Sequence, residues 1–157
     1  MSPALRFRFS LETVLHVRTI REEQARWELA QAELQLQKSR LALADTEQRR
    51  EGLLAELKEA SSRQWDIREY QTYHYYLEHL QSAILGWKEQ IAQGETVIAE
   101  KRRLLHQRHQ ERRLLEGLRE KKLAEHRREV MRILEKETEA ITLGRWQDQE
   151  RRDDVTL

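Results

Sequence analysis

Apolar residues recur at seven-residue spacing along most of this chain, in two series separated by one short break. The first series contains Ala25, Ala32, Ser39, Thr46, Leu53, Ala60 and Ile67, with Leu29, Leu36, Leu43, Arg50, Leu57 and Gln64 as companions four residues further on. The second contains Leu77, Ile84, Ile91, Ile98 and Leu105, with Tyr73, Leu80, Trp87 and Gly94 as companions. A four-three division of seven keeps one stripe of an α-helix facing a partner helix. Two such long helices leave no room for an enclosed pocket, so we expect function to lie in contacts of their ends and faces.

The composition agrees with long helices rather than with a globular domain. Charged residues make up 36% of the 157 residues and aromatic residues 6%, which is typical of coiled coils. Disorder is the competing interpretation of high charge, but disordered segments do not keep a heptad register over so many turns. The absence of cysteine excludes disulfides and thiolate metal sites. No apolar run reaches the roughly 20 residues that span a bilayer, and the N-terminus lacks the apolar core of a signal peptide. We therefore expect a soluble cytoplasmic protein.

The pattern predicts an all-α fold, an antiparallel coiled-coil hairpin of two long helices, in which the second helix is longer and has a C-terminal overhang. We expect a single domain with a first helix at about 10–60, a turn at about 61–69, a second helix at about 70–143 and a mobile tail at 144–157. Ser61 and Ser62 begin the break, Asp66 is a candidate cap for the second helix, and Gly144 offers a stop. A turn near residue 65 would place Leu29 opposite residues 97–101.

The second heptad series changes character after Leu105. Continued at the same spacing, it falls on Arg112, Arg119 and His126, while a new apolar stripe begins elsewhere on the helix. That new stripe contains Leu123, Val130, Leu134 and Ile141. We interpret the change as a phase slip that exposes a different face near the C-terminal end.

No motif for catalysis is present. The sequence contains no phosphate-binding GxxxxGK loop, no HExxH and no serine in a nucleophile elbow. His106 and His109 are three residues apart, but four basic side chains crowd them, and a metal needs three or four ligands. We expect no enzyme activity, no metal site and no cofactor.

Two surface features are candidates for protein binding. Aromatic residues gather near the predicted turn at Trp65, Tyr70, Tyr73, Tyr75 and Tyr76, and a helix pair buries only about half of such a cluster. Between Lys101 and Lys122 there are nine basic residues against three acidic ones, although the net charge of the chain is only +1. Such a run is commonly a solvated face; it attracts phosphate as well as acidic protein surfaces, but no basic-region zipper is present.

The N-terminal stretch FRFSLETVLHVRTIREEQA resembles the pattern F-x-F-x-L-x-x-V-L-x-x-R of the flagellar export protein family FliJ. Two further stretches are similar to that family in the same order: YHYYLEHLQSAI at Tyr73–Ile84 and LEGLREKKLAEHRREVMRILEKETEAI at Leu115–Ile141. The departures are Tyr76, where the family more often has Phe, and Thr138-Glu139, where it often has Asp-Glu.

This resemblance implies a stalk-like component of the flagellar type III export apparatus. Such a protein would bind the hexameric export ATPase, promote its assembly and activity, couple it to the cytoplasmic domain of the export gate and handle export chaperones. It would be cytoplasmic and peripherally associated with the inner face of the cell membrane at the flagellar base. By the matched motifs, the ATPase would contact Phe7, Phe9, Leu11, Val14, Leu15, Leu118, Arg119, Lys121 and Lys122. The gate would contact Tyr73, Tyr76, Leu77 and Leu80.

Three alternatives remain open from the residues alone. An injectisome secretion stalk belongs to the same class of machine and shares these features. A generic coiled-coil scaffold would dimerise through the exposed stripe of the second helix. A nucleic-acid-binding coiled coil would use the basic run, although we expect no nucleic acid partner.

Overall fold

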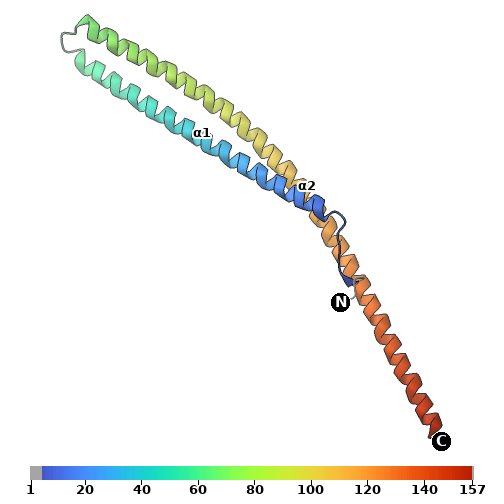
Figure 1. Ribbon diagram of the computed structural model, residues 1–157. Coiled ribbons are helices and arrows are strands. Elements are labelled where there is room, and N and C mark those ends of the chain that lie inside the picture. The colour runs from blue at the N-terminus through green and yellow to red at the C-terminus, as the bar shows by residue number, and fades with distance from the viewer. Residues whose placement is uncertain (1–4, 157) are drawn as a thin grey trace. The chain divides into compact units, whose positions relative to one another are not determined.

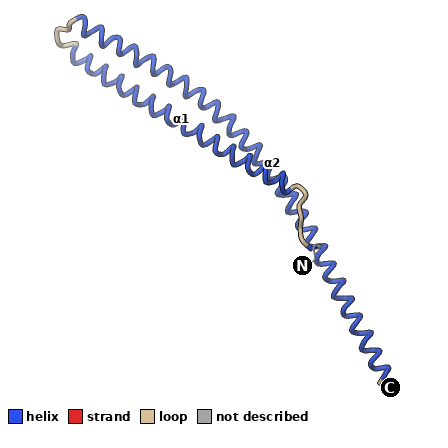
Figure 2. The backbone as a smooth tube through the Cα atoms, in the orientation of Figure 1, coloured by secondary structure: helices blue, strands red, loops and turns tan. Residues whose placement is uncertain are grey.

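The computed structural model describes residues 5–156, which form two helices and no strand. Helix α1 comprises Glu12–Ala60 and helix α2 comprises Ile67–Val155. The chain divides into two compact units. The hairpin unit is Ile20–His109, and the terminal unit consists of described residues 5–19 and 110–156. Within the hairpin unit, α1 and α2 run antiparallel on either side of a short turn (Figures 1 and 2). The predicted all-α hairpin with a longer second helix is confirmed.

The core of the hairpin unit is the predicted seam. Its buried apolar side chains are Ala25, Leu36 and Leu53 from α1 and Leu80, Ile84 and Ile98 from α2. Ser39 is buried with them and bonds back to the Gln35 carbonyl at 3.2 Å. A Cβ added to Gly94 would lie 3.2 Å from Leu36 Cδ1, so the missing side chain makes room for a leucine of the other helix. Large residues thus pack into small ones across a close helix pair.

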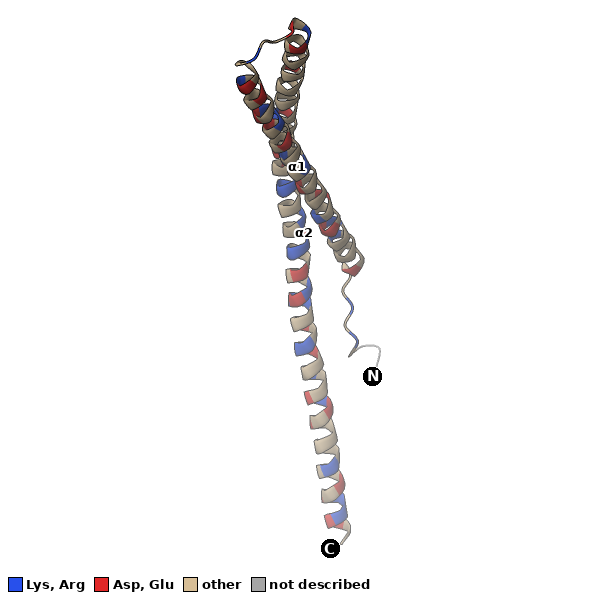
Figure 3. Ribbon diagram, turned by 90° about the vertical axis from the view of Figure 1, so that its left-hand side faces the viewer, with Lys and Arg blue, Asp and Glu red and all other residues tan. Residues whose placement is uncertain are grey.

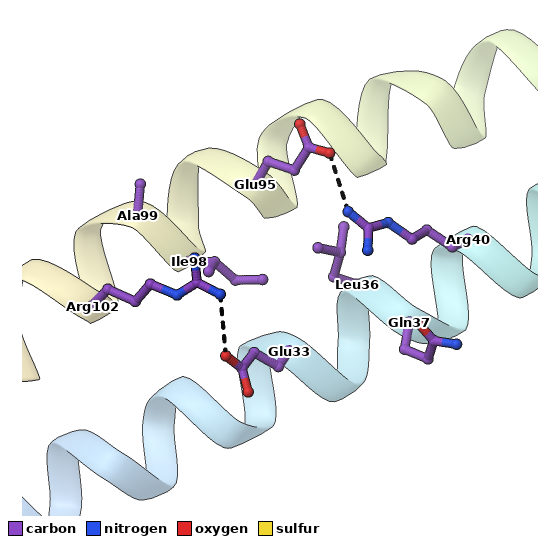
Figure 4. A pocket seen from close by; sticks show the side chains of 8 residues that line it. All are labelled: Glu33, Leu36, Gln37, Arg40, Glu95, Ile98, Ala99 and Arg102. Atoms are coloured by element: carbon purple, nitrogen blue, oxygen red, sulfur yellow. Dashed lines mark hydrogen bonds and ion pairs between the residues drawn. The ribbon is translucent and has the colours of Figure 1, made fainter.

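Ion pairs on both sides of the seam fix the register. Lys101 Nζ lies 3.0 Å from Glu28 Oε2, which agrees with the predicted placement of Leu29 opposite residues 97–101. Figure 4 shows two further pairs, Arg40 with Glu95 at 3.3 Å and Arg102 with Glu33 at 3.5 Å. The two pairs in Figure 4 are about half exposed or more, so each adds only about 0.2–1 kcal/mol and their main effect is on alignment.

The turn between the helices satisfies the free backbone groups of both ends. The hydroxyls of Ser61 and Ser62 donate to the carbonyls of Lys58 and Glu59, near the end of α1. The indole of Trp65 donates to the Ala60 carbonyl. Asp66 caps α2, because its carboxylate accepts from the Arg68 amide at 3.4 Å and its carbonyl accepts from the Tyr70 amide at 3.1 Å.

Helix α2 does not stop near Leu143 as predicted but continues through Gly144 to Val155. A glycine ends a helix when it adopts a left-handed conformation, and no described residue has a positive φ. In a right-handed conformation Gly144 costs about 1 kcal/mol relative to Ala, which a long helix tolerates. From Leu134 to Thr156 every residue is exposed, so this part of α2 has no packing partner within the described chain. Neither helix has a stretch apolar enough to cross a membrane within the described residues.

Candidate functional site

In the terminal unit, an N-terminal segment of residues 5–11 packs along α2. It precedes α1, whose first helical hydrogen bond runs from the Leu15 amide to the Leu11 carbonyl at 2.9 Å. His126 Nε2 donates to the Leu5 carbonyl at 3.0 Å. This hydrogen bond joins residues far apart in the sequence and holds the start of the segment against α2.

Phe7 is the centre of this arrangement. Its ring lies 5.5 Å from the His126 ring at a tilt of 53°, and the Arg119 guanidinium lies 5.5 Å from the Phe7 centroid. A cation within about 6 Å of an aromatic centroid contributes roughly 0.5–1 kcal/mol at an exposed site. Phe7 and Phe9 are both half-buried. Arg6, which precedes Phe7, and Arg8, which stands between the two phenylalanines, are exposed. The alternation of arginine and phenylalanine therefore turns the phenylalanines inward and the arginines outward.

Polar contacts connect α1 to α2 in the same unit. Arg119 Nε donates to Glu12 Oε2 at 2.9 Å, and Arg18 Nη1 donates to the Glu111 carbonyl at 3.0 Å. The buried apolar contribution is small, because Leu115 alone among the described residues of this unit is a buried hydrophobic residue. The terminal unit is therefore held mainly by cations, rings and carboxylates.

The segment and α2 enclose an open groove of about 590 Å³. Its walls are Phe7, Arg8, Phe9, Ser10 and Leu11 on one side and Leu118, Lys122, Glu125, His126 and Glu129 on the other. A second hollow of about 380 Å³ adjoins it and is lined by Arg6, Phe7, Arg8, Phe9, Glu12 and Arg119. The lining combines apolar side chains with charged side chains of both signs, which is the composition of many protein-docking sites.

The pKa of the Glu116 carboxylate is lowered by neighbouring arginines. Burial raises the pKa of Glu116, but hydrogen bonds and charge from Arg112 and then Arg113 outweigh this effect and hold the pKa below its ordinary value. The Arg113 Nη1 atom lies 3.2 Å from Glu116 Oε2, and Arg112 bonds the other carboxylate oxygen. Glu116 thus stays ionised beside two arginines of the basic run.

The structure brings most of the predicted ATPase-binding residues together. Phe7, Phe9, Leu11, Leu118 and Lys122 line one groove, and Arg119 reaches it through the Phe7 ring. Three others do not line it: Val14 and Lys121 are exposed and Leu15 is half-buried. Five of the nine predicted residues thus line one groove, and the motifs also include neighbours that do not line it.

His126 was not among the candidate binding residues expected from the sequence, although its heptad position placed it in line with the seam of α2. The heptad phase after Leu105 falls on Arg112, Arg119 and His126, which we interpreted as a slip to another face. In the structure these positions remain half-buried, the Arg112 side chain being only 17% exposed. Of the supposed new stripe, Leu123 and Val130 are half-buried, whereas Leu134 and Ile141 are 43% and 59% exposed. The register thus continues, with polar residues in seam positions covered by the N-terminal segment and α1.

The predicted gate-binding residues lie on α2 near the turn, in the hairpin unit. Leu80 is buried in the seam, Tyr73 and Leu77 are half-buried, and Tyr76 is 44% exposed. Tyr73 packs edge-on against Trp65 at 5.3 Å. Tyr70 and Tyr75 are 57% and 69% exposed, as expected for a helix pair that buries only part of the cluster. Tyr76 is thus the most accessible of the four predicted contacts.

His109, near the middle of α2, pairs with a carboxylate of α1. His109 Nδ1 lies 3.0 Å from Glu22 Oε1, and Glu22, only 3% exposed, also binds Arg26 at 2.9 Å. Residues 5–156 contain no cluster of three side chains suited to a metal. Acidic and basic residues are interspersed along both helices, as Figure 3 shows.

Comparison with known proteins gives one match. Residues 7–152 match the family described as the flagellar FliJ protein. No curated protein and no solved structure matches the chain. The match covers the N-terminal segment, the hairpin and most of α2, and it agrees with the two-helix fold and with the three motifs noted in the sequence. The chain belongs to the FliJ family, the stalk-like proteins of the flagellar type III export apparatus.

Proposed function

We propose that this protein binds the hexameric flagellar export ATPase through the groove of the terminal unit and promotes its assembly and activity. The observation that carries the proposal is the cluster of Phe7, Phe9, Leu11, Leu118 and Lys122 around one groove. Aromatic anchors in a hollow with a charged rim are the usual centre of a protein interface.

The groove and the adjoining hollow are lined by four Lys or Arg side chains against three glutamates, which favours an acidic partner surface. Arg6 and Arg8 project from the N-terminal segment, and Lys121 and Lys122 are exposed on α2. Cations at the rim mainly accelerate association and select a partner of opposite charge, while the apolar floor supplies affinity. We infer that the ATPase presents acidic residues to this part of the chain.

The test is the ATPase rate of the cognate export ATPase with and without this protein. Replacing Phe7 and Phe9 by Ala should abolish stimulation while leaving the helical content intact. Trp146→Ala is the matched control, because Trp146 is a 68% exposed aromatic residue of α2 outside the groove. Equal stimulation by all three proteins would overturn the assignment of the groove.

The basic rim has a separate test. Changing Arg119, Lys121 and Lys122 to Glu should weaken stimulation most at low salt, where charge steering is least screened. Stimulation that survives this triple change would remove the basic residues from the interface.

We further propose that the region near the turn contacts the cytoplasmic domain of the export gate, with Tyr76 as its most accessible residue. Tyr73 and Leu77 contribute their exposed parts, and Leu80 supports them from the seam. Tyr76→Ala with Leu77→Ala should weaken gate binding, measured by titration calorimetry. Leu85→Ala, at a 69% exposed leucine further along α2, is the control. Normal gate binding by the double variant would refute this assignment.

Two further parts of the proposal come from family membership alone. The protein handles export chaperones, with no residue assigned to that contact. It acts in the cytoplasm, peripherally associated with the inner face of the membrane at the flagellar base through its partners.

A further inference from the structure

A row of large apolar residues lies on the solvent side of α1 in the hairpin unit. Ile20, Trp27, Leu34 and Leu41 are spaced seven residues apart and are 48%, 64%, 51% and 61% exposed. Single exposed apolar residues are common, but four at a constant heptad spacing form a continuous stripe. Neither the hairpin seam nor the groove of the terminal unit uses these four side chains.

This stripe lies opposite the hairpin seam. Leu34 and Leu41 stand two residues before and five residues after the buried Leu36, so at 3.6 residues per turn they point roughly 140–160° away from it. Ala30 and Ala44 follow members of the stripe by three residues and are exposed as well. Together these residues repeat the four-three spacing of a second coiled-coil seam. One position holds the large apolar residues, and in the other Ala30 and Ala44 alternate with Glu23 and Gln37. We call it the outer face of α1.

We propose that the outer face pairs with the outer face of a second copy of this chain, with the two α1 helices antiparallel. An antiparallel seam sets the large position of one helix against the small position of the other. A two-fold axis between Gln35 and Leu36 places Trp27 opposite Ala44 of the second copy and Leu41 opposite Ala30. The large-into-small packing of the hairpin seam would thus recur on the other side of α1.

The charges beside the outer face fit this register. Arg26, Glu33, Arg40 and Glu47 alternate in sign at seven-residue spacing along one edge of it. About the same axis, Glu47 of the second copy lies two residues from the level of Arg26, and Arg40 two residues from the level of Glu33. At about 1.5 Å per residue this offset is about 3 Å, which these long side chains can span. Glu33 and Arg40 already pair with α2 (Figure 4), yet their side chains remain 49% and 52% exposed and have donors and acceptors to spare.

A parallel pairing is less favourable. It would set Trp27 against Trp27 and Glu23 against Glu23 of the second copy within the seam, and like charges in such layers repel. The outer face extends from Ile20 to Glu47, which is about 40 Å of helix at about 1.5 Å per residue. This surface is separate from the groove and from the residues near the turn, so the inference does not depend on the proposed function.

Sedimentation velocity of the full chain over a range of concentrations tests the pairing. The chain has a mass of 19.0 kDa, and we expect a species of twice that mass at high concentration. Leu34→Glu with Leu41→Glu should raise the dissociation constant of the dimer by at least about tenfold while leaving the helical content unchanged. Leu85→Glu, at an exposed leucine of α2, should dimerise like the wild type.

Cysteine cross-linking tests the register and avoids any loss of fold from added charges. The natural chain has no cysteine, so introduced thiols report only on themselves. An equimolar mixture of Ala30→Cys and Leu41→Cys chains should form a mixed disulfide on oxidation. Ala30→Cys alone should not, because its two copies would be offset by about 16 Å along the antiparallel pair, at about 1.5 Å per residue, and a disulfide requires Cα atoms within about 7 Å.

Three results would overturn the proposal. One is a monomer at every concentration. Another is a dimer that Leu34→Glu with Leu41→Glu leaves intact, which would place the contact on another surface such as α2. The third is efficient cross-linking of Ala30→Cys with itself, which indicates a parallel pair. A monomer whose outer-face variant loses chaperone binding would assign this face to the chaperone instead.

Discussion

The two units of this protein are built from the same two helices but are held together by different physical interactions. In the hairpin unit, seven-spaced apolar residues bury one another along a continuous seam, and ion pairs such as Arg40–Glu95 only align it. In the terminal unit the same positions of α2 carry Arg112, Arg119 and His126, and a non-helical segment with Phe7 covers two of them. Burial of apolar area is the larger stabilising term, so the hairpin unit should provide stability and the terminal unit should open more easily.

The largest expected effect is in the hairpin seam. Ile84→Ala should lower the free energy of unfolding by about 2–3 kcal/mol, because Ile84 is only 4% exposed and its removal leaves a cavity. Chemical unfolding followed by circular dichroism measures this loss. Leu85→Ala, at the neighbouring 69% exposed residue, should change stability by less than about 0.5 kcal/mol. Equal losses for the two variants would mean that the seam is not where the structure places it.

Phe7→Ala should have a smaller and local effect. Removing the ring abolishes its contacts with Arg119 and His126, which are worth about 1–2 kcal/mol together. Limited proteolysis should then cut the N-terminal segment several times faster, while the unfolding midpoint of the hairpin unit stays unchanged. A lower midpoint for the hairpin unit would contradict the division of stability between the units.

Two glycines of α2 provide a finer test of close packing in the hairpin unit. Gly86→Ala should stabilise the protein by about 0.5–1 kcal/mol, since an added Cβ meets nothing within 4 Å and alanine is the better helix former. Gly94→Ala should gain less, because its Cβ would press on Leu36. Thermal unfolding of both variants compares them directly, and a larger gain at Gly94 would show that the helices are farther apart there.

The smallest effect concerns pH in the terminal unit. The pKa of Glu116 is lower in the folded chain than its ordinary value of 4.5, so its contribution to stability is present above that value and disappears as the pH falls through the lowered pKa. Glu116→Gln should therefore cost at most about 0.5 kcal/mol at neutral pH and nothing in strong acid. Unfolding measured across acidic pH should show a shallower decline for the variant; parallel curves would contradict the lowered pKa.

The sequence was informative where apolar residues repeat. The two helices, the seam through Leu36 and Ile98, and the turn that begins at Ser61 all follow from the heptads and from side chains that cap helix ends. The end of α2 was not predictable in this way, because Gly144 signals a stop only if its backbone becomes left-handed. The contacts of Phe7 with Arg119 and His126 leave no hydrophobic periodicity, so the heptad pattern ends there although the packing continues. The motif resemblance located that surface, but only the structure distinguishes Phe7, which faces α2, from Val14, which is exposed.

The most direct test is hydrogen exchange of the full chain with and without the export ATPase. The central claim is that the ATPase binds the groove between the N-terminal segment and α2. It predicts slower exchange on binding in residues 5–15 and 115–129, with no change along the outer face of α1 between Ile20 and Leu41. Protection confined to α1 within the hairpin unit, or no protection under conditions where the ATPase assembles, would contradict it.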